Sequence, residues 1–172
     1  MTPKPVRRGA SRGLTVRPAA DADIAIVTEL RIALLGEHAS NPIYRRLRAD
    51  ARTRARKLYL NQIRASDQVT LLAERRGTVV GILRCVHSIG YPILLPAAYG
   101  YVSSVYVRPE ARRAGVLRAL MDEAERWCRG RGLSEIRLHN AADNALSNAT
   151  WDALGFDVVE HLRMRPLVPE AG

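Results

Sequence analysis

The sequence of 172 residues is poor in aromatic side chains, cysteine and acidic residues, and these shortages narrow the classes of protein it can encode. Only 5% of the residues are aromatic, so the chain offers no row of rings on which nucleic-acid bases could stack. The two cysteines, Cys85 and Cys128, lie in apolar runs without a CxxC or histidine spacing. This pattern indicates core thiols in a reducing compartment, and we expect neither a bound metal nor a disulfide.

Long apolar runs and the common nucleotide-binding motifs are also missing. No run approaches the roughly 20 apolar residues of a membrane-spanning helix, and no apolar segment follows Met1 as in a secretory signal. Neither GxxxxGK[ST] nor GxGxxG occurs, so no motif supports a P-loop protein or a dinucleotide-binding protein. We expect a cytoplasmic protein that does not enter a membrane.

Basic residues, nearly all arginine, are abundant. Lysine and arginine number 27 against 17 acidic residues, which gives a formal charge of +10. Such a surface attracts anions, whether a phosphate-bearing cofactor, an acidic substrate or nucleic acid. The length suits one domain, for which we predict residues 14–172, preceded by a mobile basic tail, residues 1–13.

The stretch from Tyr99 to Cys128 carries the clearest pattern. A half-apolar strand is followed by a turn at Pro109, a basic loop that ends in Gly115, and an amphipathic helix. The start of a helix leaves backbone N–H groups unpaired and carries the positive end of the helix dipole, so this turn suits a pyrophosphate. The alternative from periodicity alone is an ordinary connection with two solvated arginines.

Hydrophobic periodicity predicts a mixed α/β fold, with six or seven strands in one sheet and helices on both faces. The expected element order is β-α-α-β-β-β-α-β-α-β-β. Outside the central stretch, we expect helices over residues 22–35, from Pro42 to 63, and 143–155, and strands over 14–18, 68–74, 79–88, 133–139 and, once or twice, 158–167.

Two blocks carry a resemblance to a known family. The segment PEARRAGVLRAL resembles the acyl-CoA loop of the GNAT superfamily of N-acetyltransferases, with Arg112 and Gly115 on its first two fixed positions. Leu117 stands where the family usually has Gly or Ala. The segment DNALSNATWDALGF resembles a second family helix, in which Asn144 and Trp151 fall on fixed positions. Together with the opening segment, the resemblance covers nearly all of residues 14–167.

The resemblance implies acetyl-CoA as cofactor and direct attack by a primary amine of a small molecule or peptide. The implied contacts to the cofactor are backbone groups of one strand, the pyrophosphate turn and one side chain on the following helix. They comprise Val105, Tyr106, Val107, Arg112, Arg113, Ala114, Gly115, Val116, Leu117 and Asn144. The acceptor can be acidic, given the charge of the chain, and the protein is expected to be a monomer or a homodimer.

The catalytic groups are less clearly marked. Many family members place a tyrosine, which protonates the leaving thiolate, where this chain has Trp151, and Ser147 lies about one turn away. An indole N–H is not a usable acid. His139 is our first candidate for the base, with His87, the pair Glu37-His38 and a water relay as alternatives.

Two other classes of function stay open. A protein of this fold that binds CoA without catalysis would show the same replacement of tyrosine by Trp151. A nucleic-acid binder could use residues 1–13 and the arginine-rich segment 45–57, but it has charge without a motif, so we do not favour it.

Overall fold

The structure is a computed structural model that describes residues 13–167. The predicted basic tail, residues 1–13, therefore lies outside the described residues except for Gly13. The chain divides into two compact units, the first ending at His139 and the second beginning at Asn140. Within residues 13–167, no helix is long and apolar enough to cross a bilayer.

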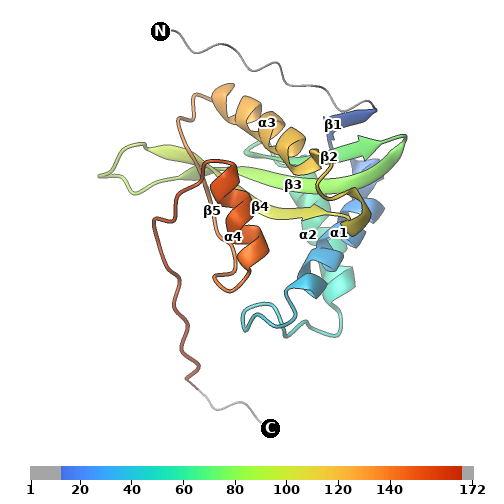
Figure 1. The fold of residues 1–172 in the computed structure, drawn as a ribbon, viewed down its shortest axis with the longest axis horizontal. Coiled ribbons are helices and arrows are strands. Elements are labelled where there is room, and N and C mark those ends of the chain that lie inside the picture. Colours follow the sequence, from blue (N-terminus) through green and yellow to red (C-terminus); the bar gives the residue numbers. More distant parts are fainter. Residues whose placement is uncertain (1–12, 168–172) are drawn as a thin grey trace. The chain divides into compact units, whose positions relative to one another are not determined.

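The first unit contains a five-stranded sheet whose strands follow one another in chain order (Figure 1). Neighbouring strands are antiparallel except for the last pair, which is parallel. The strands are β1 (Leu14–Pro18), β2 (Gln68–Arg75), β3 (Thr78–Ile89), β4 (Ala98–Val107) and β5 (Ile136–Leu138). The predicted mixed α/β class is confirmed, although the sheet has fewer strands than the six or seven expected.

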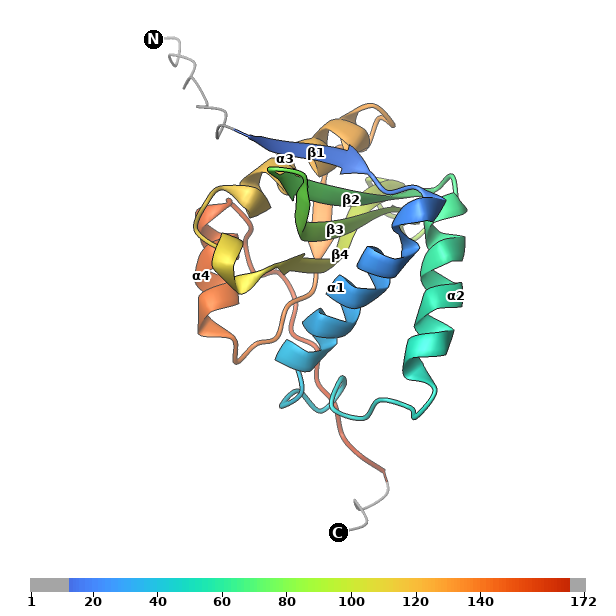
Figure 2. The same cartoon turned by 90° about the vertical axis from the view of Figure 1, so that its right-hand side faces the viewer.

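Helices cover both faces of this sheet. Helices α1 (Ile24–Glu37) and α2 (Ala51–Arg64) lie side by side on one face, and α3 (Val116–Arg129) lies on the other (Figure 2). A short 3-10 helix, Pro109–Ala111, connects β4 to α3, and another, Asp21–Asp23, precedes α1. Both faces of the sheet are therefore buried, which explains why consecutive residues of β2 and β3 are inaccessible to solvent.

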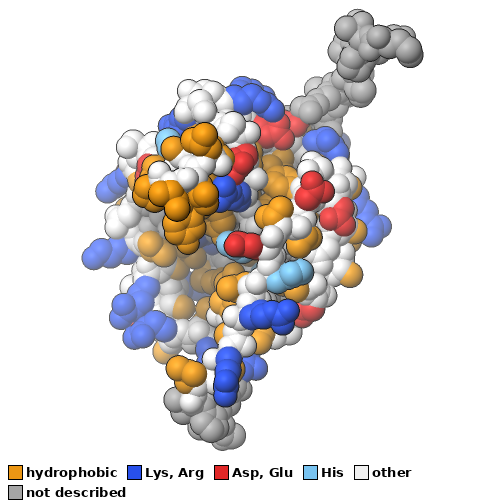
Figure 3. All heavy atoms as spheres, turned by 90° about the vertical axis from the view of Figure 1, so that its left-hand side faces the viewer, with side chains coloured by type: hydrophobic (Ala, Val, Ile, Leu, Met, Phe, Trp, Pro, Cys, Tyr) orange, Lys and Arg blue, Asp and Glu red, His pale blue; other side chains and the backbone are white. Residues whose placement is uncertain are grey.

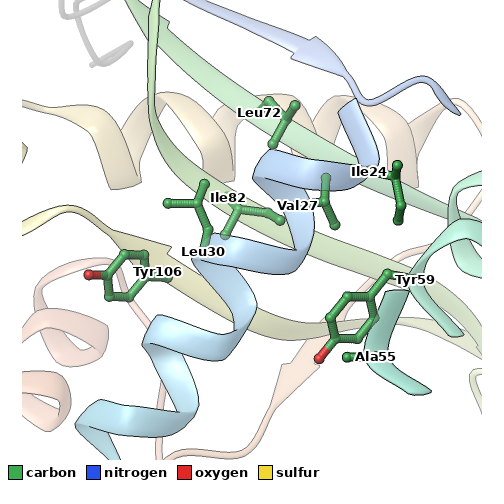
Figure 4. Packing of buried hydrophobic residues seen from close by; sticks show 8 residues of the cluster. All are labelled: Ile24, Val27, Leu30, Ala55, Tyr59, Leu72, Ile82 and Tyr106. Carbon is green, nitrogen blue, oxygen red and sulfur yellow. The ribbon is translucent and has the colours of Figure 1, made fainter. Parts of the chain in front are cut away.

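The core between the sheet and the first two helices is built from aliphatic side chains and two tyrosines (Figure 4). The helices contribute Ile24, Val27, Leu30, Ala55 and Tyr59, and the strands contribute Leu72, Ile82 and Tyr106. On the opposite face, α3 buries the stripe that its sequence periodicity predicted, including Leu120, Met121, Ala124 and Cys128. Cys85 and Cys128 are both buried and free, with their Sγ atoms 3.6 Å apart.

The second predicted helix begins later than expected. Residues 39–50 form turns and irregular chain, so Tyr44 and Leu47 are exposed instead of joining the apolar stripe of α2. The amide of Ile43 donates to the side chain of Asn41 at 2.9 Å, which closes a turn that competes with helix formation. Periodicity alone could not register this local competition.

The last strand of the sheet is also shorter than the predicted 133–139. Gly132 has a φ of 70° at the end of α3, and the amide of Leu133 donates to the carbonyl of Cys128 at 3.1 Å. Leu133 therefore belongs to the closing turn of the helix. Only Ile136–Leu138 remains to pair with β4.

The second unit contains α4 (Ala145–Ala153), which lies within the helix predicted over 143–155. The Asn144 side chain accepts from the amide of Ser147 at 3.0 Å, and Gly155, with a φ of 85°, ends the helix. The prediction of one or two strands over 158–167 is wrong, because these residues form no strand. Their apolar side chains, such as Val159 and Leu167, are exposed, so the alternating pattern lacks the buried face that would stabilise a strand.

A large apolar loop projects from the first unit. It joins β3 to β4. In the space-filling view from the left-hand side of Figure 1, hydrophobic side chains, in orange, gather in this region (Figure 3). Ile93 and Leu95 are 92% and 93% exposed. The loop therefore adds nothing to the core that positions the site.

Candidate functional site

The sheet opens along the C-terminal half of β4. Strand β5 pairs with β4 only from Gly100 to Val102, so residues 103–107 have no strand on that side within residues 13–167. The pairing with β3 also shifts register opposite Ile82 and Arg84, and Ser104 has a φ of 55°. A positive φ in a residue other than glycine is uncommon and marks a bulge here. The open edge contains Val105, Tyr106 and Val107, the residues predicted to contact the pantetheine arm.

The connection between β4 and α3 is held in place by Arg112. Its Nε donates to the carbonyl of Val107 at 2.9 Å, and its Nη2 is paired with the carboxylate of Glu37. Arg113, with a φ of 60°, is exposed. Arg112 thus has a structural partner on α1, whereas the side chain of Arg113 projects from a turn that is strained for an L-residue.

The start of α3 presents a set of open backbone donors. Gly115 is the N-cap residue with a φ of 78°, and no side chain caps the helix. Residues 112–115 form a turn, and beyond it the first amide with a close hydrogen bond is that of Ala119, at 3.0 Å from the carbonyl of Gly115. These donors and the helix dipole together favour an anion.

Close packing fixes this helix start against the sheet. A Cβ on Gly81 of β3 would lie 2.9 Å from Cγ1 of Val116 and 3.3 Å from Cδ1 of Leu120. Val116 and Leu120 are buried. The open donors therefore belong to a rigid element, as a binding site requires.

His139, the predicted base, lies just beyond β5 and is exposed. Its Nδ1 is 2.8 Å from the hydroxyl oxygen of Tyr101, and the two rings meet edge to face. Burial raises the pKa of Tyr101 above its ordinary value, and nearby Tyr44 and Tyr99 raise it further. The hydrogen bond to Tyr101 therefore holds an exposed imidazole at the end of β5, where it can accept a proton.

In the second unit, α4 carries the remaining predicted residues. The Asn144 side chain caps the helix through the amide of Ser147, and Trp151 is buried against Phe156 with ring centroids 5.4 Å apart. Trp151 therefore has a packing role within its own unit. The contact of Asn144 with a cofactor and the catalytic roles of Ser147 and Trp151 stay predictions.

From the sequence we missed two arginines, Arg31 on α1 and Arg84 on β3, on the side of the sheet that α1 and α2 cover. Arg31 lies 3.7 Å above the ring of Tyr59 and donates to the side chain of Gln62. Arg84 donates to Gln68 at 2.6 Å and to the hydroxyl of Ser103 at 3.1 Å. Each arginine interrupts an apolar run, LRIALL and GILRCV, and this interruption is the signal that could have revealed them.

Burial changes the acid–base properties of both arginines. It lowers the pKa of Arg31 to about 10, and the neighbouring charge of Arg84 contributes to the decrease. Burial likewise lowers the pKa of Arg84. Because arginine keeps its charge in proteins, two cations are held in partly dehydrated surroundings on this side of the sheet.

Comparison with known proteins identifies the family. The sequence profile of the Acetyltransferase (GNAT) family matches residues 36–156, and the chain belongs to this family. The match spans the open edge of β4, the turn and α4.

The relatives that match are named for aminoglycosides. The chain is 40% identical over 63 residues to an aminoglycoside N(6′)-acetyltransferase type 1 of Klebsiella aerogenes, and 34% over 62 residues to one of Acinetobacter genomosp. 13. These matches cover 37% and 36% of this chain, and 41% and 42% of the respective relatives, so the chain spans about two fifths of the length of the curated relatives it matches.

Solved structures agree over a longer span. A predicted acetyltransferase of Clostridium acetobutylicum, solved with acetyl-CoA, superposes with a TM-score of 0.74 at 17% identity, covering 90% of this chain and 96% of its own. An aminoglycoside 6′-N-acetyltransferase of Acinetobacter haemolyticus superposes with a TM-score of 0.72 at 22% identity, covering 91% and 99%. At these identities the likeness establishes the fold.

Proposed function

We propose that the protein is an N-acetyltransferase that moves the acetyl group of acetyl-CoA to a primary amine of a small molecule or peptide by direct attack in a ternary complex. The observation that carries the proposal is the row of open amides at the start of α3, directly after the unpaired edge of β4. Family membership and the names of the relatives support the same reaction.

The residues present fit CoA. The amides of residues 113–118 would hold the pyrophosphate, because Gly115 lets a ligand approach the main chain and the helix dipole favours the negative charge. The edge from Val105 to Val107 would hold the pantetheine arm through backbone hydrogen bonds. Acetyl-CoA, when bound, supplies an acetyl thioester that is activated toward attack by an amine.

The acceptor amine must lose a proton before or during attack. His139 would take this proton, and its hydrogen bond to Tyr101 would hold the imidazole in one orientation. The basis for this role is geometric: an exposed imidazole beside a half-buried phenol at the end of β5.

Two measurements test the proposal together. Acetyl-CoA should raise the melting temperature, because a ligand that binds only the folded protein stabilises it. Thiol release from acetyl-CoA should depend on an added primary amine. Unchanged melting at saturating CoA would remove the cofactor assignment, whereas stabilisation without thiol release from any amine would favour the alternative, a CoA-binding protein without catalysis.

The Trp151→Tyr variant distinguishes these alternatives further. The variant restores a phenol at the position where the family usually has one, and we expect kcat to rise with little change in KM, because a proton donor to the thiolate acts in the transition state. Steady-state kinetics of thiol release measure both constants. A lower kcat in a folded variant would instead give the indole a positioning role of its own.

A further inference from the structure

Arg31 and Arg84 come together from different elements on the face of the sheet covered by α1 and α2. Arg84 lies two residues beyond Ile82 on β3, and Ile82 packs in the same cluster as Tyr59, the residue on which Arg31 stacks. Alternation along a strand places Arg84 on the face of Ile82. Arg31, stacked on Tyr59, and Arg84, on the face of Ile82, therefore border the same apolar cluster.

Neither arginine of this pair meets a carboxylate. Within residues 13–167, the partners of Arg31 are an amide oxygen and an aromatic face, and those of Arg84 are an amide oxygen and a hydroxyl. Asp67 acts on Arg84 only through its more distant charge. Other arginines do have ion-pair partners, as in Arg17–Asp23, Arg64–Asp21, Arg108–Glu29, Arg112–Glu37, Arg129–Glu125 and Arg137–Glu135.

Two like charges in a partly dehydrated place repel each other, and an anion between them would relieve the repulsion. A guanidinium group binds carboxylate or phosphate oxygens through paired N–H donors. Arg84 is also tied to Ser103 of β4, and Tyr101, two residues earlier on the same strand, contacts His139. One strand therefore connects the arginine pair to the candidate base.

We propose that Arg31 and Arg84 bind an acidic group, a carboxylate or a phosphate, carried by the amine that the protein acetylates. The inference rests on the proposed function, since it concerns the acceptor of that reaction. It also separates this protein from relatives named for aminoglycosides, because an aminoglycoside carries several cationic amines that the arginine pair would repel.

The first experiment compares matched amines with the wild-type protein. γ-Aminobutyrate and aminoethyl phosphate carry an acid, γ-aminobutyramide is the neutral counterpart, and putrescine carries a second cation. Calorimetric titration into the CoA-loaded protein should show that at least one acid binds about tenfold or more tighter than the amide, with putrescine weakest. Whichever acid binds more tightly identifies the group as carboxylate or phosphate. Equal binding of acid, amide and putrescine would overturn the inference.

Variants then assign the preference to the pair. Arg84→Gln should reduce the affinity for the acid to that of the amide, and Arg84→Lys, which keeps the charge and guards against misfolding, should retain part of the preference. Arg56→Gln removes one charge from the exposed side of α2 and should change nothing. A preference for acids that survives in both Arg84→Gln and Arg31→Gln would also overturn the inference.

Thiol release distinguishes this failure from failure of the proposed function. Tight acid binding without thiol release from any amine would support the arginine site and remove the catalytic proposal. Thiol release with the amide and putrescine as efficient as with the acids would support catalysis and remove the arginine site.

Discussion

Arg17 and Arg31 show two ways in which one fold holds a guanidinium group. Arg17 on β1 donates to both carboxylate oxygens of Asp23, at 2.7 and 2.8 Å, and to Glu74 at 2.8 Å. These hydrogen bonds raise its pKa above the ordinary value. Arg31 on α1 has only neutral partners, and burial lowers its pKa to about 10.

This contrast indicates which arginine belongs to the scaffold. The charge of Arg17 is neutralised within the protein, so it ties the first strand to the start of α1 and to β2. The charge of Arg31, reinforced by Arg84, is left without a counterion within the described residues. Because a half-buried cation without an acidic partner lowers stability, its presence indicates a role outside folding.

Reversing a charge in the pair should have the largest effect. In Arg84→Glu, a carboxylate would pair with Arg31 and repel an acidic acceptor, so we expect kcat/KM for the preferred acid to fall about 100-fold or more, about 2.7 kcal/mol. The melting shift caused by CoA should persist, since the turn before α3 is untouched. Arg56→Glu on α2 is the matched control. An equal loss of activity in this variant would mean that the net charge of the protein causes the effect, and not the arginine pair.

A large side chain at the start of α3 should have the next largest effect, and it should lower only the affinity for the cofactor. In Gly115→Trp, a side chain occupies the place where a phosphate must approach the main chain, so CoA affinity should fall about tenfold or more, about 1.4 kcal/mol. Gly132→Trp is a matched control, because Gly132 has a similar φ of 70° at the other end of the helix and open space around it. Calorimetric titration of CoA into both variants makes the comparison. If the two variants bind CoA equally well, the placement of the pyrophosphate is wrong.

The sequence predicted features that depend on neighbouring residues better than features that depend on residues far apart in the chain. The amphipathic helix α3 and the helix predicted over 143–155 depend on neighbouring residues, and both are present in the structure. The strands expected over 158–167 are absent, because strand formation requires a partner that no local pattern specifies. Arg31 and Arg84 border the same cluster only because a helix folds over a strand far along the chain, which hydrophobic periodicity does not encode.

Removing the neutralised arginine should affect stability and leave selectivity unchanged. Arg17→Gln should lower the free energy of unfolding by about 1 kcal/mol, the upper end for partly exposed ion pairs. For a chain of this size, that loss lowers the melting temperature by about 2–4 °C. Thermal unfolding measures the loss, and an altered preference among the acceptor amines would contradict the scaffold role.

The same ion pair should make the stability of the protein depend on pH through the ionisation of Asp23. Arg17 lowers the pKa of Asp23 in the folded protein. The stabilising contribution of ionised Asp23 is therefore fully present above its pKa in the unfolded chain, about 3.9. It is lost as the pH falls through the lower pKa that Asp23 has in the folded protein. The difference in free energy of unfolding between wild type and Asp23→Asn should be constant near neutral pH and shrink below about pH 4. A difference that grows on acidification would contradict the pairing.

The smallest expected effect is the stability change in Arg31→Met, and it most directly tests the contrast with Arg17. Methionine retains an unbranched stem over the ring of Tyr59 but removes the charge and the bond to Gln62. The lost cation–π contact and hydrogen bond oppose the gain from removing a half-buried cation beside Arg84, so the free energy of unfolding should change by no more than about 0.5 kcal/mol. Denaturant unfolding of the two variants side by side gives the comparison. A loss in Arg31→Met as large as that in Arg17→Gln would make Arg31 a structural link between α1 and α2, and the acidic acceptor would then depend on Arg84 alone.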